Sequence, residues 1–160
     1  MRSTLLAATF VTMSFFLAAM NATPGEVPPD RYFLRILGSA RELEVSSLDP
    51  SAKDEKDGFH GYKVLGKTTV KDPETVKALV AAFKKGVEES GGAAAKDFEP
   101  RHGVRFVLNK TTVDLLLCSR TKVYYNGLKG ADFVIAKSPQ AAFDRVLKAA
   151  GVELAKPAEK

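Results

Sequence analysis

The hydrophobic pattern of the chain contains two stretches with the spacing of an amphipathic helix. In the first, apolar residues recur every three or four positions and would form one stripe on a helix surface: Val76, Leu79, Val80, Phe83 and Val87. Asp72 is a favourable N-cap, Pro73 suits the first helical turn, and Gly91 is a typical stop. This pattern predicts a helix from Pro73 that ends before Gly91.

The second helical stretch lies near the C-terminal end of the sequence. We expect Ser138 to cap it and Pro139 to occupy its first position. The predicted buried stripe consists of Phe143, Val146, Leu147 and Ala150. Gly151 is expected to end the helix, with Val152 folding back as the apolar contact of a helix-ending motif.

Period-two alternation and runs of β-branched or aromatic residues predict strands in the first half of the chain. We predict strands at Tyr32 to Leu37, at Leu43 to Leu48 and at Phe59 to Val70. Between the last two, Asp49 to Gly58 is rich in charged residues and begins and ends with turn-forming pairs, which predicts a solvated loop.

The segment from Phe98 to Tyr125 is central to the predicted fold. Its first six residues, as far as Gly103, are expected to form a bent loop that leads into a strand. A tight turn near Asn109 and Lys110 should then reverse the chain into a second apolar strand, which carries Cys118.

A further hairpin is predicted where Asn126 precedes Gly127, because both residues tolerate the positive φ angles of a tight turn. It should join Lys122 to Tyr125 to a strand near Asp132 to Ala136. Strands before, between and after two helices predict an α+β fold, with a mainly antiparallel sheet and both helices packed on one face. The other face would be partly solvated, and we predict that it is a binding surface.

The N-terminal residues have the composition of an export signal. A positive start at Met1 and Arg2 precedes an apolar run and small residues, which is typical of a secretory signal peptide. We predict a signal peptide at 1–22, a Pro-rich linker at 23–30, one domain at 31–154 and a disordered tail at 155–160. The protein would be exported, to the periplasm or beyond the cell. The alternative is an uncleaved anchor, although the run is shorter than the roughly 20 residues that a bilayer crossing needs.

The charge of the chain does not indicate a nucleic-acid partner. Its formal net charge is +5, but lysine and arginine alternate with acidic residues along most of the sequence. Nucleic-acid binding favours clustered positive charge with aromatic stacking positions. We expect no nucleic acid as partner and no membrane span after signal cleavage, and we leave the partner open between a protein and a small molecule.

Cys118 is the only cysteine, and two interpretations of it remain open. It is either a small buried hydrophobe or a nucleophile activated by a neighbouring base. His102 is the candidate base because its loop leads into the strand paired with the cysteine strand, and Asp114 completes a weak catalytic candidate set.

The tetrapeptide from Pro100 to Gly103 suggests a binding site instead. Arg101 has the planar donor fork that clamps carboxylates or phosphates, and His102 adds a pH-sensitive donor. The alternative is that Arg101 pairs with a local acid, Glu99 or Asp97. His60 is a further binding candidate. No histidines or cysteines have the close spacing of a zinc site, and we predict neither a metal nor a cofactor.

Four segments carry a resemblance to a known family: Ser47 to Pro50, His60 to Gly66, Asp97 to Gly103 and Leu117 to Thr121. In these segments the chain resembles a family of small uncharacterised exported bacterial proteins that share a Cys-Phe-x-Pro-Arg-His-Gly loop and an Ile-Cys-Phe-x-Cys strand end. The resemblance implies export and a shared fold, without an established activity. Asp97 and Thr121 stand where the family has cysteines, so a site built from those cysteines would not form here.

These features support two functional hypotheses. The first is a non-catalytic binding domain that uses the open sheet face and the loop with Arg101 and His102. The second is a small hydrolase or thiol enzyme centred on Cys118 and His102. The two hypotheses differ in whether the thiol and the imidazole should lie within hydrogen-bond reach.

Overall fold

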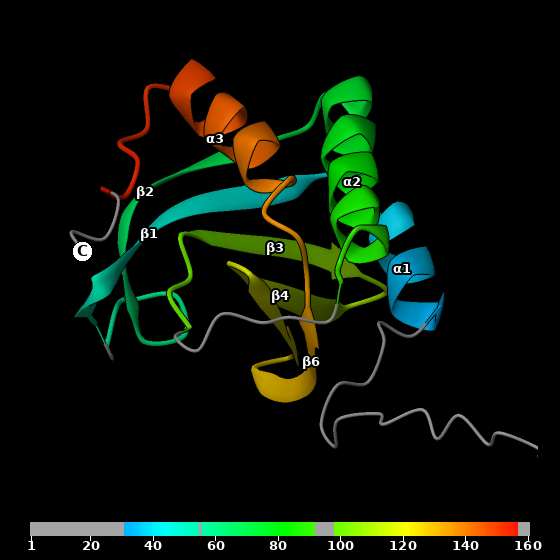
Figure 1. Cartoon of the computed structure of the whole chain (residues 1–160), viewed down its shortest axis with the longest axis horizontal. Helices are drawn as coiled ribbons and strands as arrows, with labels where there is room; N and C mark the ends of the chain where they lie inside the picture. The colour runs from blue at the N-terminus through cyan, green and yellow to red at the C-terminus, as the bar shows by residue number, and fades with distance from the viewer. Residues whose placement is uncertain (1–30, 55, 92–97, 157–160) are drawn as a thin grey trace, which may run out of the picture.

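The computed structural model describes residues 31–54, 56–91 and 98–156, which form a six-stranded sheet and three helices (Figure 1). Along the chain the elements are α1 (Arg31–Gly38), β1 (Leu43–Lys53), β2 (Tyr62–Val70), α2 (Pro73–Glu88), β3 (His102–Leu108), β4 (Thr111–Leu117), β5 (Arg120–Tyr125), β6 (Leu128–Val134) and α3 (Gln140–Ala149). The signal peptide and linker predicted at 1–30 lie outside the described residues.

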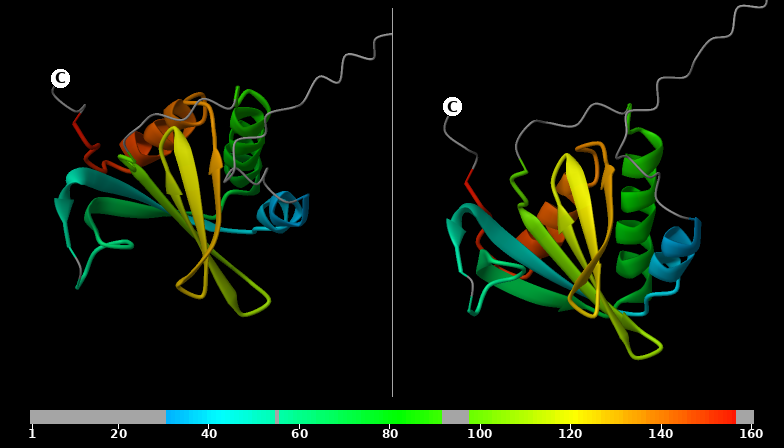
Figure 2. Two further views of the ribbon diagram at one scale, coloured as in Figure 1. Left: turned by 60° about the horizontal axis from the view of Figure 1, so that its bottom comes forward. Right: turned by 90° about the horizontal axis from the view of Figure 1, so that it is seen from below.

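All neighbouring strands of the sheet are antiparallel, in the order β2-β1-β3-β4-β5-β6. The sheet is strongly twisted, and the helices gather over one of its faces (Figure 2). The predicted α+β class with a mainly antiparallel sheet is therefore confirmed.

The main core lies between the sheet and the helices. Three rings from different elements meet there: Phe33 of α1, Phe83 of α2 and Phe133 of β6, with centroids 6.1 to 6.3 Å apart. A smaller apolar cluster, built on Leu48, Phe59 and Leu116, covers part of the opposite face. That second face, called here the open face, is thus covered only in part.

The strand predicted at Tyr32 to Leu37 is wrong, because these residues lie in α1. Phe33 and Leu37 are four residues apart and are both buried, so the short apolar run matches one helical turn as well as a strand. Periodicity does not distinguish the two over so few residues, and packing of Phe33 against α2 favours the helix.

The charged loop predicted at Asp49 to Gly58 begins later than expected, because β1 continues to Lys53. The pairing of β1 with β2 shifts register between Asp49 and Lys53, and Pro50 lies within that irregularity. A proline is tolerated there because the ladder is already interrupted. The next strand also starts later than predicted, at Tyr62, after a turn that begins at Phe59.

Both predicted hairpin turns are present. Asn109 and Lys110 have φ angles of 50° and 70°, and Asn126 and Gly127 have φ angles of 48° and 82°. The side chain of Asn126 also accepts a hydrogen bond from the backbone N–H of Thr112 at 2.8 Å.

The predicted N-cap is correct for α2 and wrong for α3, and α2 ends at Glu88 with Glu89 as its C-cap, two residues before the predicted stop at Gly91. Asp72 accepts from the backbone N–H of Thr75 at 2.8 Å, as expected of an N-cap. Ser138 does not cap α3, because its hydroxyl donates to Glu89 at 2.6 Å and so links α3 to the end of α2.

The C-terminal end of α3 follows the predicted motif and leads into ordered chain. The backbone N–H of Val152 donates to Leu147 O at 2.9 Å, and Gly151 has a φ of 71°. Ala155, placed by the sequence in the tail, is buried. The ordered chain thus extends past the predicted boundary at Leu154, and 157–160 lie outside the described residues.

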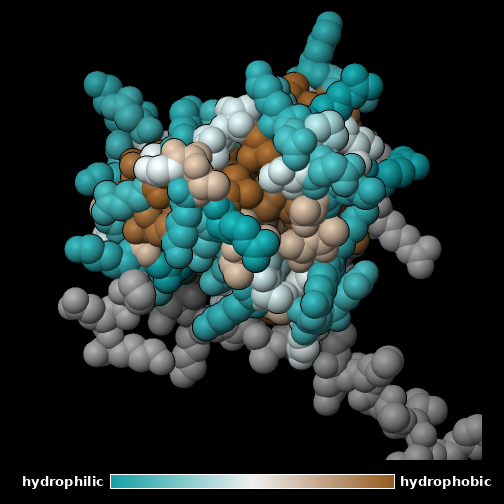
Figure 3. All heavy atoms as spheres, turned by 90° about the horizontal axis from the view of Figure 1, so that it is seen from above, coloured by the Kyte–Doolittle hydropathy of each residue, from teal (hydrophilic) through white to brown (hydrophobic). Residues whose placement is uncertain are grey.

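The surface seen from above is mostly hydrophilic, with apolar patches between the polar side chains (Figure 3). Among the described helices, none is both long and apolar enough to cross a bilayer.

A candidate binding site on the open sheet face

The candidate site is built on a row of cross-strand partners. Register aligns Glu44 of β1 with Arg105 of β3, Arg105 with Asp114 of β4, and Asp114 with Tyr124 of β5. Directly opposed residues point to the same face of a sheet. The four side chains therefore line up across the open face.

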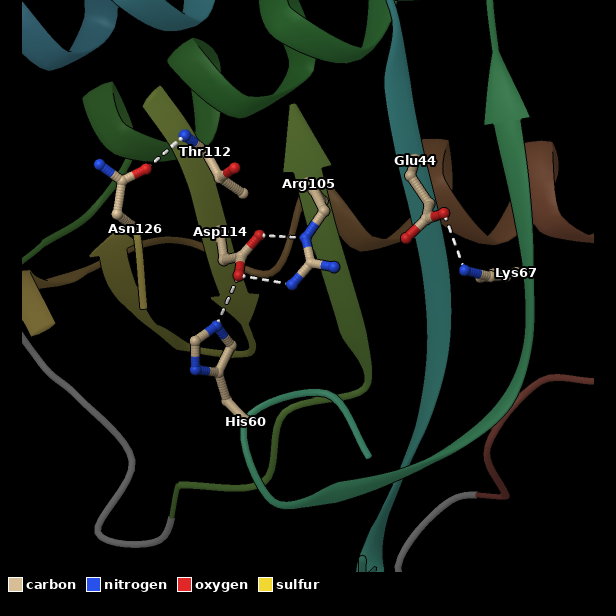
Figure 4. Close-up of polar contacts among 7 residues, drawn as sticks. All are labelled: Glu44, His60, Lys67, Arg105, Thr112, Asp114 and Asn126. Carbon is tan, nitrogen blue, oxygen red and sulfur yellow. Dashed lines mark hydrogen bonds and ion pairs between the residues drawn. The ribbon is translucent and has the colours of Figure 1, made fainter. Parts of the chain in front are cut away.

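Asp114 is the centre of this row. Its side chain is only 3% exposed, and both of its oxygens are hydrogen-bonded (Figure 4). Arg105 donates from Nε to Oδ1 at 2.7 Å and from an Nη atom to Oδ2 at 2.8 Å, the bidentate geometry of a strong ion pair. The carboxylate thus fixes the plane of the guanidinium, while the Arg105 side chain remains 45% exposed.

His60 reaches the same carboxylate from a distant part of the chain. Its Nε2 lies 2.8 Å from Asp114 Oδ2 (Figure 4). The imidazole stacks on the ring of Tyr124 with centroids 3.8 Å apart and an interplanar angle of 20°. The imidazole therefore has a fixed orientation, and 15% of the His60 side chain is exposed.

The backbone conformation of His60 is unusual. His60 has a φ of 50° and the following Gly61 a φ of 83°, in a tight turn closed by two hydrogen bonds between Phe59 and Tyr62. A positive φ is disfavoured for a residue with a side chain, and such strain is concentrated at functional sites. This turn, 59–62, directs the imidazole onto the sheet.

Phe59 anchors the turn by packing on a glycine of the sheet. A Cβ placed on Gly103 would lie 2.8 Å from the Phe59 ring, closer than two carbon atoms can approach. The ring also joins Leu48 and Leu116 in the small apolar cluster of the open face. The absence of a side chain at Gly103 is therefore what allows the His60 turn to dock.

The charges of the site stabilise one another. Burial, the largest single influence, raises the pKa of Asp114, but hydrogen bonds from Arg105 and His60 together outweigh it, and the net pKa is below the usual value. The bond to Asp114 also raises the pKa of Arg105. Asp114 therefore stays ionised and accepts a hydrogen bond from Nε2–H of His60. The other ring nitrogen of His60, Nδ1, does not face the carboxylate.

Further cations and aromatic rings surround this centre. Arg105 lies over Phe59 at 5.2 Å, Lys53 over Tyr62 at 3.4 Å and Lys122 over Phe98 at 3.8 Å. Each is within the range of a cation–π contact. Two acidic side chains oppose these cations. Glu44 is paired with Lys67 at 2.9 Å (Figure 4), and Asp132, which lies opposite Lys122 in the register, is paired with Arg120 and Lys129.

His102 is not part of this site. It points to the helix side of the sheet, is 2% exposed, and has Nε2 at 2.8 Å from Asp144 of α3. Its Nδ1 is buried without a hydrogen-bond partner among the described residues. Burial, the largest influence, lowers the pKa of His102, against the opposing effect of Asp144.

Arg101 lies beside His102 but has a different partner. Its guanidinium donates to the backbone carbonyl of Ala155 and so holds the segment after α3. Glu99 forms no ion pair with it in the part of the chain that is described, and Asp97 lies outside that part. The loop that carries Arg101 and His102 is thus committed to internal contacts.

Cys118 is buried in a turn after β4. Its thiol donates to Arg120 O at 3.2 Å and accepts from the backbone N–H of Arg120 at 3.3 Å. Burial, the largest influence, raises the pKa of the thiol. Cys118 and His102 line the same cavity, but its volume is only about 10 Å³, and no hydrogen bond joins their side chains among the described contacts.

The predicted site residues therefore separate into two groups. His60 and Asp114 come together on the open face, whereas Arg101, His102 and Cys118 lie where β3 begins and β4 ends, and His102 and Cys118 line a cavity with Phe143 of α3. Within the described ranges, no group of three or more His, Cys, Asp or Glu side chains is arranged to hold a metal ion.

Sequence reasoning missed Arg105 and Tyr124. A signal for Arg105 was available, because counting outward from the turn at Asn109 and Lys110 pairs Arg105 with Asp114. No comparable signal exists for His60, which lies 54 residues from Asp114 in the sequence.

Comparison with known proteins identifies no relative: no family model, no curated protein and no solved structure gives a significant match to the chain. The resemblance to small exported bacterial proteins therefore stays a prediction.

Proposed function

We propose that this protein is an exported, non-catalytic binding domain that recognises a carboxylate-bearing ligand through the open sheet face. The observation that carries this proposal is the pairing of an exposed guanidinium with a buried carboxylate. Asp114 holds Arg105 in one plane by two hydrogen bonds, while 45% of the Arg105 side chain stays accessible. A guanidinium held in this way loses little side-chain entropy on binding an anion.

The remaining donors of the site support the same ligand class. One terminal nitrogen of Arg105 makes no bond to Asp114, and His60 presents its second ring nitrogen, Nδ1. Lys53 and Lys122 add positive charge at the margin of the site. Together these groups favour a ligand with a carboxylate and an apolar or aromatic part.

The geometry gives less support to catalysis. Asp114 has both oxygens occupied and a lowered pKa, so it is poorly suited to proton transfer. No described serine, threonine or cysteine side chain forms a hydrogen bond with His60. The alternative of a thiol enzyme has weaker support still, because Cys118 is buried with a raised pKa.

The revised site differs from the sequence-based proposal in two respects: Arg105 and Tyr124 are added, and one loop is removed. The open face remains the binding surface, but the loop with Arg101 and His102 is left out. His102 is 2% exposed, and the guanidinium of Arg101 is bound to the carbonyl of Ala155.

The proposal is tested by NMR titration of the full chain with glutarate and with glutaramide, its neutral amide of the same shape. Glutarate should shift the side-chain Nε–H signal of Arg105 and the backbone signal of Tyr124, and glutaramide should not. R105Q should abolish the Tyr124 shift, whereas R145Q, on exposed α3, should retain it. Equal shifts with both compounds, or no shifts at millimolar glutarate, would show that the site does not recognise carboxylates.

A further inference from the structure

A second hollow lies on the helix side of the molecule, away from the open face. It has a volume of about 600 Å³ and runs between α2 and the connection from α1 to β1. This volume lies within the range of small-molecule sites, about 300 to 1,000 Å³. The hollow is called here the α2 groove.

The α2 groove is lined by cations and by no acidic residue. Arg41, Lys71, Lys77 and Lys84 all contribute to its walls. Of these four cations, only Lys71 forms an ion pair with another described residue, Glu42 at 3.7 Å. Both of these side chains are largely exposed. Such a pair contributes little. The groove therefore concentrates positive charge that the described part of the chain does not neutralise.

The floor of the α2 groove is apolar. Val80 and Ala81 lie one turn after Val76 and Lys77 along α2, and Lys84 lies one turn beyond them. Residues three and four positions apart share one face of a helix, so the apolar strip and its flanking lysines form a continuous wall. On the opposite wall, Gly38 leaves room for Lys84, whose Nζ lies 3.4 Å from the position of a Cβ on that glycine.

We propose that the α2 groove binds a small organic anion with an apolar body, such as an aromatic or medium-chain carboxylate or sulfonate. The apolar body would lie on Val76, Val80 and Ala81, and the acidic head would lie among the lysines. An anion there would relieve the repulsion among the four cations, and desolvation by the floor would strengthen its attraction to them. This site is separate from the open face and does not depend on the function proposed there.

The test uses 1-anilinonaphthalene-8-sulfonate, an aromatic anion, and N-phenyl-1-naphthylamine, the same ring system without the sulfonate. The full chain should bind the sulfonate more tightly, and the affinity should fall as salt is added. The double variant K77Q/K84Q should weaken sulfonate binding about five- to tenfold, as expected for removal of two exposed charges, and leave the amine unchanged.

Matched variants on α2 separate the groove from the helix surface in general. K85Q should bind the sulfonate like the unaltered chain, because Lys85 does not line the groove. A81F should block binding by filling the floor, whereas A78F, at an exposed position outside the lining, should not. R105Q should also leave sulfonate binding intact.

A measurement on the unaltered chain tests the site without relying on variants that could misfold. The sulfonate should shift backbone NMR signals of residues 38–41 and 76–84 in the unaltered chain. Shifts confined to other residues, equal affinity for the two compounds, or undiminished sulfonate binding by folded K77Q/K84Q would each overturn the proposal.

Discussion

The ring of Phe59 lies directly on the backbone of Gly103, within 2.8 Å of where a Cβ would stand. This contact joins the turn before β2 to the centre of the sheet. It sets the height of His60 above the sheet and so brings the imidazole within hydrogen-bond distance of Asp114. The absence of a side chain at Gly103 is thus a structural requirement of the candidate site.

Replacement of this glycine should displace the turn. G103A should lower the free energy of unfolding by about 1 to 3 kcal/mol, because the new methyl group overlaps the Phe59 ring. Urea denaturation measures the loss, and NMR of the His60 ring measures the displacement. G91A is the matched control, since no atom lies within 4 Å of a Cβ at Gly91. Equal stabilities for the two variants would contradict the proposed contact.

Replacement of Asp114 should weaken the fold and change its response to acid. D114N should lower the free energy of unfolding by about 2 to 3 kcal/mol at pH 7, because hydrogen bonds to an ionised group are lost. The pKa of Asp114 is lowered in the folded chain. Its contribution is therefore fully present above the unfolded-state pKa, about 3.9, and is lost as the pH falls through the lower folded-state pKa.

Urea unfolding from pH 7 to pH 2 measures this difference between the two proteins. The stabilities should converge only below about pH 4. D144N, which removes a half-buried carboxylate on α3, serves as the comparison. A difference between the unaltered chain and D114N that is constant down to pH 2 would contradict the assignment.

His102 should make the fold sensitive to mild acid. Burial lowers its pKa in the folded chain, so between the folded-state and unfolded-state pKa values the unfolded chain binds more protons. Stability from this group is complete above the unfolded-state pKa, about 6.5, and declines as the pH falls below it. In H102Q the urea concentration at the unfolding midpoint should therefore fall less between pH 7.5 and pH 5 than in the unaltered chain. An equal fall of the midpoint in H102Q and in the unaltered chain would show that groups other than His102 cause the acid sensitivity.

Cys118 should react slowly with iodoacetamide while the chain is folded. Its thiol is buried and its pKa is raised, so little thiolate is accessible. Mass spectrometry should show slow modification from pH 6 to pH 9, and rapid modification in urea at the same pH. Rapid reaction of the folded chain near neutral pH would instead support the thiol-enzyme hypothesis.

The sequence predicted those parts of the fold that depend on neighbouring residues. The N-cap and apolar stripe of α2 and the two-residue turns at Asn109 and Asn126 all follow from local sequence preferences. The errors occurred where distant contacts decide the structure. α1 is a helix because Phe33 packs against Phe83, 50 positions later, and the extension of β1 depends on its pairing with β2.

The candidate site was predictable in part for the same reason. Strand alternation placed Asp114 on one face, and the turn at Asn109 sets the register that pairs it with Arg105. His60 was identified as a binding candidate without its partner, because no local pattern links the turn 59–62 to β4. The sequence also favoured Arg101 and His102, whose burial depends on α3 and on the segment around Ala155.

The hydrogen bonds of Asp114 also imply an order of assembly. Its bonds to Arg105 join residues nine positions apart in the sequence, whereas its bond to His60 joins residues 54 positions apart. Closing a short loop costs less entropy and takes less time than closing a long one. The β3/β4 hairpin can therefore present a preformed carboxylate and guanidinium before the turn 59–62 arrives. Contact between His60 and Asp114 then marks a late step of folding, when the open face first acquires its final shape.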